Sequence, residues 1–208
     1  MLPLVLDLTG RKVVIFGGGP VGARKAAFFL GESRVVVASR SFGKELSGLD
    51  VERVEMDLGT ASDREIAGLL EGAFLAVAAV GDASLNTRIL SLCRRSGILC
   101  NSATGDPGDV IIPSVWKGQS HAVAVTTFGR SPAMARYIRE KMALDADGID
   151  LMIELQARAR EALKDTEPDQ EKRSATLWAI LHDPAAWEAV SRGENAAWEY
   201  VRGRYLHG

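Results

Sequence analysis

Three glycines near the N-terminus have a spacing that suits phosphate binding. Gly17, Gly19 and Gly22 follow the G-x-G-x-x-G pattern, directly after an apolar run at residues 13–16 and before a helical pattern at residues 23–30. In such a strand–turn–helix unit the first glycine permits a tight turn, the second lets the backbone approach a pyrophosphate, and the third lets helix and strand pack closely. The helix N-terminus adds free N–H groups and about half a positive charge. The pattern predicts a dinucleotide site whose residues are Gly17, Gly19, Pro20, Val21 and Gly22.

The end of the next apolar run bears on which dinucleotide would bind. Residues 34–38 predict a second parallel strand, and an Asp or Glu at the end of that strand usually accepts hydrogen bonds from the ribose 2′-hydroxyl of NAD. This chain has Ser39, Arg40 and Ser41 there instead. Because Arg pairs well with phosphate, these residues alone favour NADP. Val80 ends a further apolar run and is expected to face the cofactor crevice.

A glycine- and aspartate-rich loop at residues 102–109 follows an expected strand at residues 98–101. Loops at the carboxyl ends of parallel strands often carry chemistry, and the candidates here are Thr104 and Asp106. The alternative is a long turn in which the Asp side chains cap backbone N–H groups.

A basic helix is expected at residues 133–142, with Ser131 as its N-cap. It carries Arg136, Arg139 and Lys141. Two interpretations stay open: a solvated basic face, or a cationic wall that binds an acidic substrate.

The spacing of apolar residues predicts an α/β protein with a parallel sheet, followed by a helical tail from about residue 145. The expected strands are residues 2–8, 13–16, 34–38, 51–56, 74–80, 98–101, 110–113 and 121–127, with a polar turn at 117–120 between the last two. The expected helices are residues 23–30, 63–70 (capped by Ser62), 82–95, 133–142, 150–163, 171–181, 184–191 and 195–206. The tail holds Trp178, Trp187 and Trp198, which either fill a small helical core or cover a planar ligand.

The composition argues against several classes of protein. Of 208 residues, 47% are hydrophobic and 25% charged, and the net charge of -2 gives no basic field for nucleic acid or an anionic membrane. No apolar stretch reaches the ~18 residues of a membrane span, and the first residues lack the basic region of a signal peptide. We therefore expect a cytoplasmic protein. Cys93 and Cys100 are expected to be reduced core thiols, and three scattered histidines predict no fixed metal site.

Four segments carry a more specific combination of motifs. They are residues 2–13 (LPLVLDLTGRKV), 17–26 (GGGPVGARKA), 109–114 (DVIIPS) and 126–140 (TTFGRSPAMARYIRE). Together they resemble the precorrin-2 dehydrogenase (sirohydrochlorin-forming) family, which includes the N-terminal half of multifunctional sirohaem synthase. The resemblance covers essentially residues 1–145 and extends less clearly into the helical tail.

The resemblance implies a homodimer of three parts: an N-terminal NAD-binding Rossmann domain (residues 1–113), a dimerisation segment (residues 114–145) and a small helical C-terminal domain (residues 146–208). It also implies oxidation of a tetrapyrrole, precorrin-2, to sirohydrochlorin with NAD. In some members iron chelation then gives sirohaem. Because the family handles the adenosine ribose without the usual acidic residue, NAD is the expected cofactor, while NADP stays open.

One departure from the family concerns the residue credited with catalysis. Members typically place an Asp directly after an Asn-Val-Val-like strand, whereas this chain reads Asn101, Ser102, Ala103, Thr104. Thr104 therefore occupies the catalytic position, and Asp106 stands two residues further on. Either Asp106 reaches into the site, or Thr104 with water handles the departing proton. The missing carboxylate weighs most against chelation, because a carboxylate helps to accept pyrrole protons.

The many carboxylates of precorrin-2 call for a cationic site, and the expected substrate-binding residues are Arg130, Ser131, Arg136 and Arg139. Two other functions remain as alternatives. One is a non-catalytic, redox-sensing dimer that binds NAD(H), and the other is a tetrapyrrole chelatase or chaperone without dehydrogenase activity.

Overall fold

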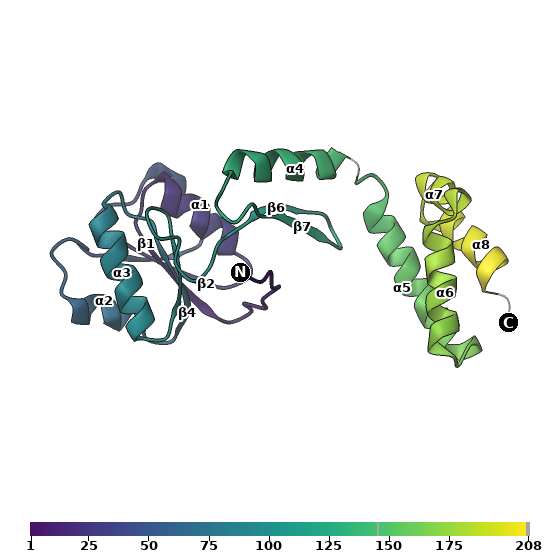
Figure 1. The fold of residues 1–208 in the computed structure, drawn as a ribbon, viewed down its shortest axis with the longest axis horizontal. Helices are drawn as coiled ribbons and strands as arrows, with labels where there is room; N and C mark the ends of the chain where they lie inside the picture. Colours follow the sequence, from purple (N-terminus) through teal and green to yellow (C-terminus); the bar gives the residue numbers. More distant parts are fainter. Residues whose placement is uncertain (145, 207–208) are drawn as a thin grey trace. The chain divides into compact units, whose positions relative to one another are not determined.

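The computed structural model describes residues 1–144 and 146–206. The chain forms two compact units, Met1–Ile112 and Pro113–Gly208. The first unit alternates strands and helices, and the second is mainly helical after a short hairpin (Figure 1).

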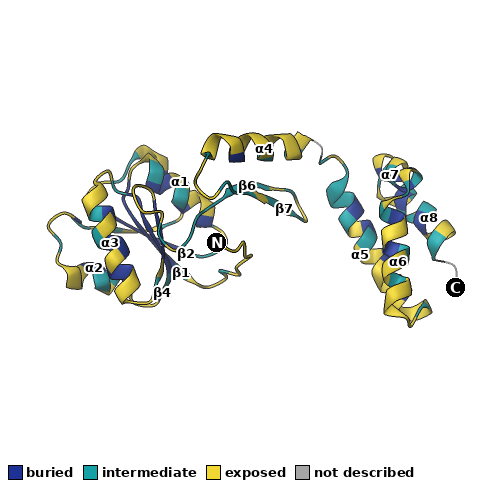
Figure 2. Cartoon of the chain, in the orientation of Figure 1, coloured by how far each residue is buried: buried dark blue, intermediate teal, exposed yellow. Residues whose placement is uncertain are grey.

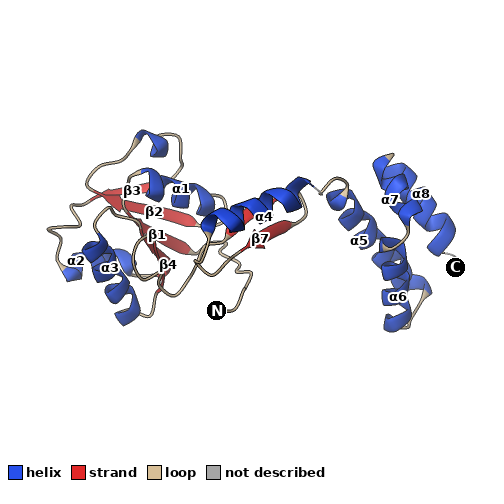
Figure 3. Ribbon diagram, turned by 45° about the horizontal axis from the view of Figure 1, so that its top comes forward, coloured by secondary structure: helices blue, strands red, loops and turns tan. Residues whose placement is uncertain are grey.

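The first unit is a five-stranded parallel sheet with helices. Its elements are β1 (Lys12–Phe16), α1 (Pro20–Phe29), β2 (Arg34–Ser39), the short 3₁₀ helix η1 (Lys44–Leu46), β3 (Glu52–Glu55), α2 (Asp63–Leu70), β4 (Ala73–Ala78), α3 (Ala83–Arg95) and β5 (Leu99–Ser102). The strand order is β3-β2-β1-β4-β5, and every neighbouring pair is parallel (Figure 3). This order places a crossover between β1 and β4, where doubly wound sheets bind dinucleotides. The predicted α/β fold with a Rossmann-type sheet is confirmed.

The central strand is buried on both faces of the sheet because it is apolar from Val13 to Phe16. Val14 and Phe16 belong to one core cluster, which includes residues of α2 and α3. Val13 and Ile15 point the other way, into a cluster that includes residues of α1. The central strands are accordingly buried in Figure 2. Continuous apolar runs of this kind are typical of parallel strands covered on both sides. The expected core thiols, Cys93 and Cys100, are free and buried.

The second unit begins with an antiparallel hairpin and continues as helices. Its elements are β6 (Ser114–Lys117), β7 (Ala122–Val125), α4 (Pro132–Leu144), α5 (Ile149–Thr166), α6 (Gln170–Leu181), α7 (Pro184–Ser191) and α8 (Glu194–Tyr205). Residues from α5 to α8 share a buried core, to which α5 contributes Met152, Leu155, Ala159 and Leu163. Their three- and four-residue spacing is that of one helix face. None of the described helices is long and apolar enough to cross a membrane.

Two of the predicted strands are wrong. Residues 2–8 form no strand, and Leu2 and Val5 are 77% and 103% exposed. An apolar segment becomes a strand only beside a partner, and this segment pairs with no strand among the described residues. Residues 110–113 are also irregular, because the N–H groups of Asp109 and Val110 donate to the Cys100 carbonyl. The hairpin strand begins only after them, at Ser114.

The other elements match the predictions within a few residues at their ends. Both predicted N-caps are confirmed. The Ser62 hydroxyl accepts from the Glu65 N–H, and the Glu65 carboxylate accepts from the Ser62 N–H at 2.7 Å, which completes a capping box. The Ser131 hydroxyl accepts from the Met134 N–H at 3.2 Å. Of the tail tryptophans, Trp187 and Trp198 pack against the helical core, whereas Trp178 is 60% exposed.

Asp150 in the first turn of α5 holds the tip of the hairpin. Its carboxylate accepts hydrogen bonds from the backbone N–H groups of Gln119 (3.0 Å) and Ser120 (2.8 Å), and it lies 2.8 Å from Nδ1 of His121. The two backbone hydrogen bonds and the His121 contact lower the pKa of Asp150 to about 2. The ionised carboxylate therefore stabilises the second unit.

We expect Asp150→Asn to lower the unfolding temperature at pH 7 and to matter less as the pH falls. The pKa of about 2 in the folded state lies below the unfolded value of about 3.9, so the stabilisation is complete above pH ~4 and is lost towards pH 2. Thermal unfolding followed by tryptophan fluorescence measures this dependence. Asp147→Asn, an exposed carboxylate in the preceding turn, is the matched control and should unfold as the wild type does. Equal effects of the two substitutions would contradict the role of Asp150.

Candidate functional site

Two glycines of the motif are required by the closeness of the surrounding backbone. Gly17 follows β1 with a φ of +118°, and a side chain there would strike the Ala79 carbonyl just beyond β4. A side chain at Gly22 would strike the carbonyl of Gly17 itself. The turn from β1 into α1 therefore presses against the end of β4 and closes over its own first residue. These are the tight-turn and close-packing roles expected of the first and third glycines.

Gly19 differs because the space beside it is open. A Cβ there would meet no atom within 4 Å, and its φ of -83° is ordinary for any residue. Gly19 is the N-cap of α1, no side chain caps the helix, and Pro20 occupies the first turn. The N–H groups of the first turn, including those of Val21 and Gly22, lack the usual helical acceptors. Open space beside free N–H groups is what a pyrophosphate requires, so these residues fit a dinucleotide.

The loop after β2 lies against the same turn. A side chain at Gly18 would strike the Ser41 carbonyl and the Ser39 side chain, and the Gly43 N–H donates to the Gly18 carbonyl at 2.8 Å. The structure thus brings Ser39 and Ser41 together with the glycine turn. Arg40 is 79% exposed in its side chain and lies 3.6 Å from the Asp57 carboxylate. That carboxylate offsets part of the charge that would attract a 2′-phosphate.

A buried amide joins the ends of β4 and β5 in the crevice. Asn86 of α3 is fully buried, and its Nδ2 donates to the Val80 carbonyl (2.9 Å) and to Oγ1 of Thr104 (2.7 Å). The Val80 N–H donates back to Oδ1 of Asn86 at 3.1 Å. Sequence reasoning missed Asn86. The available signal was a polar residue on the stripe that continues through Ile89 and Cys93, at helical spacing.

The aspartates of the loop after β5 hold the loop itself. Asp106 accepts from the Gly108 N–H at 2.8 Å and from Nη2 of Arg94 at 3.0 Å. The hydrogen bond from Gly108, and then the Arg94 guanidinium, keep the pKa of Asp106 below its usual value. Asp109 accepts from the Cys100 N–H at 3.2 Å. The lowered pKa makes Asp106 a weaker proton acceptor than an ordinary carboxylate.

The predicted substrate-binding residues lie in the second unit, at and after a strained turn. Phe128 has a φ of +54°, the one positive value among the described non-glycine residues, and its side chain is exposed. Strain of this kind often marks a ligand site. Ser131 caps α4, and Arg130 precedes that cap in an exposed position.

Two arginines of α4 share one carboxylate. Glu140 lies 2.7 Å from Nε of Arg136 and 2.9 Å from Nη2 of Arg139. These contacts lower the pKa of Glu140 and leave one net positive charge on the three side chains. Both interpretations of the basic helix stay open, because the cations are exposed yet partly neutralised.

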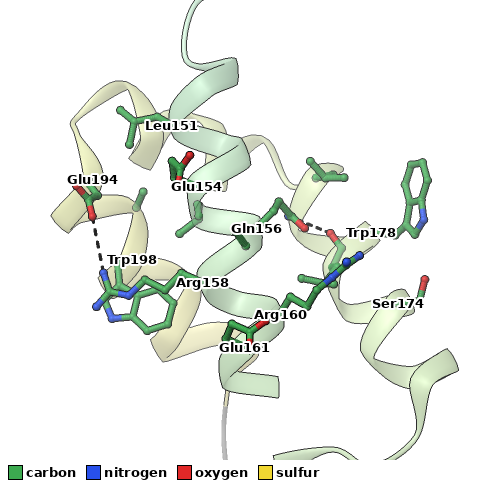
Figure 4. A pocket seen from close by; sticks show the side chains of 15 residues that line it. Leu151, Glu154, Gln156, Arg158, Arg160, Glu161, Ser174, Trp178, Glu194 and Trp198 are labelled. Atoms are coloured by element: carbon green, nitrogen blue, oxygen red, sulfur yellow. Dashed lines mark hydrogen bonds and ion pairs between the residues drawn. The ribbon is translucent and has the colours of Figure 1, made fainter. Parts of the chain in front are cut away.

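The second unit also has a groove of about 850 Å³ around α5. Arg158 lies 3.8 Å above the ring of Trp198 and 4.0 Å from Glu194, on the opposite side of α5 from Arg160 and Trp178 (Figure 4). The charged lining residues are three glutamates and two arginines, so the groove has no strong preference for an anion. Among residues 1–144 and 146–206, no cluster of His, Cys, Asp and Glu has the arrangement of a metal site.

We expect Gly19→Ala to weaken dinucleotide binding without unfolding the protein. The added methyl group would enter free space, but that space is where the pyrophosphate approaches, so the Kd for NADH should rise about tenfold or more. Titration of NADH fluorescence measures this. Gly22→Ala is the contrasting variant: its methyl group meets backbone, and it should cost about 1–3 kcal/mol of folding stability. Unchanged affinity in a folded Gly19→Ala protein would contradict the placement of the phosphates.

Comparisons with known proteins agree with this geometry. A family model described as "Putative NAD(P)-binding" matches residues 4–114. A precorrin-2 dehydrogenase of Methanosarcina barkeri is 40% identical over 203 residues, which cover 95% of this chain and 90% of that protein. A siroheme synthase of Chromobacterium violaceum is 33% identical over 199 residues, which cover 94% of this chain and 41% of that protein. The solved structure of "SirC, precorrin-2 dehydrogenase" shares the fold, with a TM-score of 0.73 at 19% identity over 98% of this chain and 100% of the other. The chain belongs to the precorrin-2 dehydrogenase family.

Proposed function

We propose that this protein oxidises precorrin-2 to sirohydrochlorin in sirohaem biosynthesis, with NAD as the hydride acceptor. The observation that carries this function is the 40% identity to the Methanosarcina barkeri precorrin-2 dehydrogenase over nearly the whole of both chains. The open turn at Gly19, with its free N–H groups, supports the cofactor part of the proposal.

The reaction removes two hydrogens from the macrocycle. One leaves as a hydride to the nicotinamide, which gives NADH, and the other leaves as a proton to solvent. When bound, NAD supplies the hydride acceptor, and the chain supplies binding and orientation. Gly17 to Gly22 hold the pyrophosphate, and Val80 lies beyond the end of β4, where the crevice of such a sheet receives the nicotinamide.

Thr104 is the better of the two candidate catalytic residues. Thr104 is exposed and its hydroxyl is held by Asn86, whereas Asp106 is held by Arg94 and Gly108 and has a lowered pKa. Thr104 therefore orients a reacting group or a water molecule that receives the proton. Iron chelation is not part of the proposal, because a neutral hydroxyl accepts pyrrole protons far less readily than a carboxylate.

The carboxylates of the substrate are bound by the turn before α4 and by its basic side chains. Arg130, Arg136 and Arg139 supply positive charge, and the N-terminus of α4 beyond Ser131 adds its helix dipole. Arg136 and Arg139 exchange Glu140 for a substrate carboxylate, which costs little at Arg136 because its pair with Glu140 is exposed, whereas Arg139 is half-buried.

NAD is preferred to NADP in this proposal. A 2′-phosphate would have to compete with Asp57 for Arg40, and Ser39 lies against Gly18. We also place the protein in the cytoplasm, as the sequence predicts.

The proposal includes a homodimer, formed through residues 114–145. The helix α4 buries only Ala135 among its described residues, and it leaves Met134, Ile138 and Met142 between 37% and 48% exposed. These residues are spaced four apart and form an apolar stripe on one face of the helix. Such a stripe is stabilised by a second copy of the same surface.

An anaerobic spectrophotometric assay of precorrin-2 oxidation, run with NAD and with NADP in parallel, tests the activity. We expect turnover with NAD, with a lower KM and a higher kcat/KM than with NADP. Gly19→Ala, which blocks the phosphate position, serves as the negative control. Absence of turnover with both cofactors would refute the proposed function. Cofactor-dependent assembly in that case would favour the redox-sensing dimer, and iron-dependent sirohaem formation without a nicotinamide would favour a chelatase.

The dimer is tested by light scattering during size-exclusion chromatography. We expect twice the mass of one chain for the wild type, and one chain mass for Ile138→Asp, because a carboxylate in an apolar interface must be desolvated. Glu140→Gln, on the polar side of the same helix, is the control and should keep the dimer. A monomeric wild type, or a dimeric Ile138→Asp, would refute the interface.

A further inference from the structure

Asn86 is a buried polar side chain in an apolar part of α3. It is 0% exposed, as are Ile89 and Cys93 on the same face of the helix. An amide that lost its hydrogen bonds in such surroundings would be left buried and unpaired, which is strongly unfavourable. The amide instead makes three hydrogen bonds just beyond the carboxyl ends of β4 and β5: it donates to Val80 and Thr104 and accepts from Val80.

The two hydrogen bonds with Val80 fix which way the amide faces. Oδ1 accepts the Val80 N–H and Nδ2 donates to the Val80 carbonyl, so a flipped amide would place donor against donor and acceptor against acceptor. The second hydrogen of Nδ2 must then go to Oγ1 of Thr104, 2.7 Å away. Since Nδ2 has no lone pair to offer, the Thr104 oxygen is always the acceptor in this contact.

The direction of that hydrogen bond decides what Thr104 can do. Asn86 donates to one of the two lone pairs of the Thr104 oxygen, so the Thr104 hydrogen cannot point at Nδ2 and is available to an acceptor elsewhere. The backbone beside it is also held, because the Ala103 N–H donates to the Ala78 carbonyl (2.9 Å) and the Ser102 hydroxyl donates to the Thr104 carbonyl (2.8 Å). Thr104 is exposed whereas Asn86 is not. Thr104 is therefore an exposed residue at the crevice whose backbone is held in place.

We propose that Asn86 is a positioning residue that sets the Thr104 hydroxyl as a hydrogen-bond donor toward an acceptor atom of the bound cofactor or substrate. This inference rests on the proposed function. Asn86 itself touches no ligand; it acts through Thr104 and also fixes Val80, which lies beside the nicotinamide end of the crevice. The specific claim is the direction of this hydrogen bond: the Thr104 hydrogen, directed away from Nδ2 of Asn86, is donated to the ligand.

The test compares two substitutions that leave the shape of the site in place. Thr104→Val removes the hydroxyl, and Asn86→Asp replaces the donor by an acceptor, so that the hydroxyl turns back toward α3. We expect each to lower kcat for precorrin-2 oxidation about tenfold or more, and the double variant to be no slower than the slower single variant, because both remove one hydrogen bond. Thr104→Ser should recover most of the loss. Thr87→Val, which removes an exposed hydroxyl from the next position of α3, is the matched control.

A pH profile separates positioning from a merely structural effect. The introduced carboxyl of Asn86→Asp is buried, which raises its pKa, and its protonated form has one hydrogen that Oγ1 of Thr104 can accept in competition with the Val80 carbonyl. The activity of this variant relative to wild type should therefore increase as the pH falls. NADH titration locates the acceptor: a raised Kd in Thr104→Val places it on the cofactor, and an unchanged Kd with reduced kcat places it on the substrate.

Two results would overturn the inference. One is full kcat in Thr104→Val, which needs no change at Asn86 and so does not depend on whether Asn86→Asp folds. The other is an additive loss in the double variant. A wild-type protein without turnover would instead overturn the proposed function itself, so the two failures are distinct.

Discussion

The structure depends on how closely the backbone turns between the central strand and the first helix. At Gly17 a side chain would strike the carbonyl just beyond β4, and at Gly22 it would strike the turn itself. Because nothing larger than hydrogen fits, α1 begins directly at the carboxyl edge of the sheet. Its first N–H groups therefore face the crossover between β1 and β4, where the strand order changes direction. The loop after β2 then packs on this turn through Gly18.

At the same edge of the sheet, charged and neutral side chains have different roles. Asp106 and Asp109 bind Arg94 and backbone N–H groups, so their charges fix the loop after β5. Thr104, which is neutral and exposed, lies beyond the end of β5 and accepts a hydrogen bond from the buried Asn86. In the proposed site, a neutral hydroxyl avoids a fixed negative charge next to a substrate that carries many carboxylates. Within the first unit, the charged side chains therefore stabilise the loop, whereas a neutral side chain lies at the proposed ligand site.

Local patterns explain why much of the fold could be predicted from the sequence. The glycine spacing, the apolar runs on both sides of it and the capping box at Ser62 each involve residues close together in the chain. The two wrongly predicted strands depend instead on which partners each segment meets in the folded protein. Residues 2–8 have the composition of a strand but no neighbouring strand among the described residues. Residues 110–113 form no strand because the N–H groups of Asp109 and Val110 donate to the Cys100 carbonyl.

The site shows the same limit. The prediction of phosphate binding at Gly19 rests on a local motif, whereas the role proposed for Asn86 depends on its contacts with Val80 and with Thr104, which is 18 residues away. The pairing of Arg136 with Glu140 is a four-residue spacing, but the sequence alone does not say whether the pair persists when a substrate binds.

The aromatic residues give the two units separate optical signals. All four tryptophans, at positions 116, 178, 187 and 198, belong to Pro113–Gly208, and none belongs to the unit that carries the glycine turn. Indole emission therefore reports on the hairpin and the helices, while the emission of a reduced nicotinamide reports on the crevice of the sheet. The efficiency of resonance energy transfer from the tryptophans to the reduced nicotinamide would therefore measure the distance between the second unit and the cofactor.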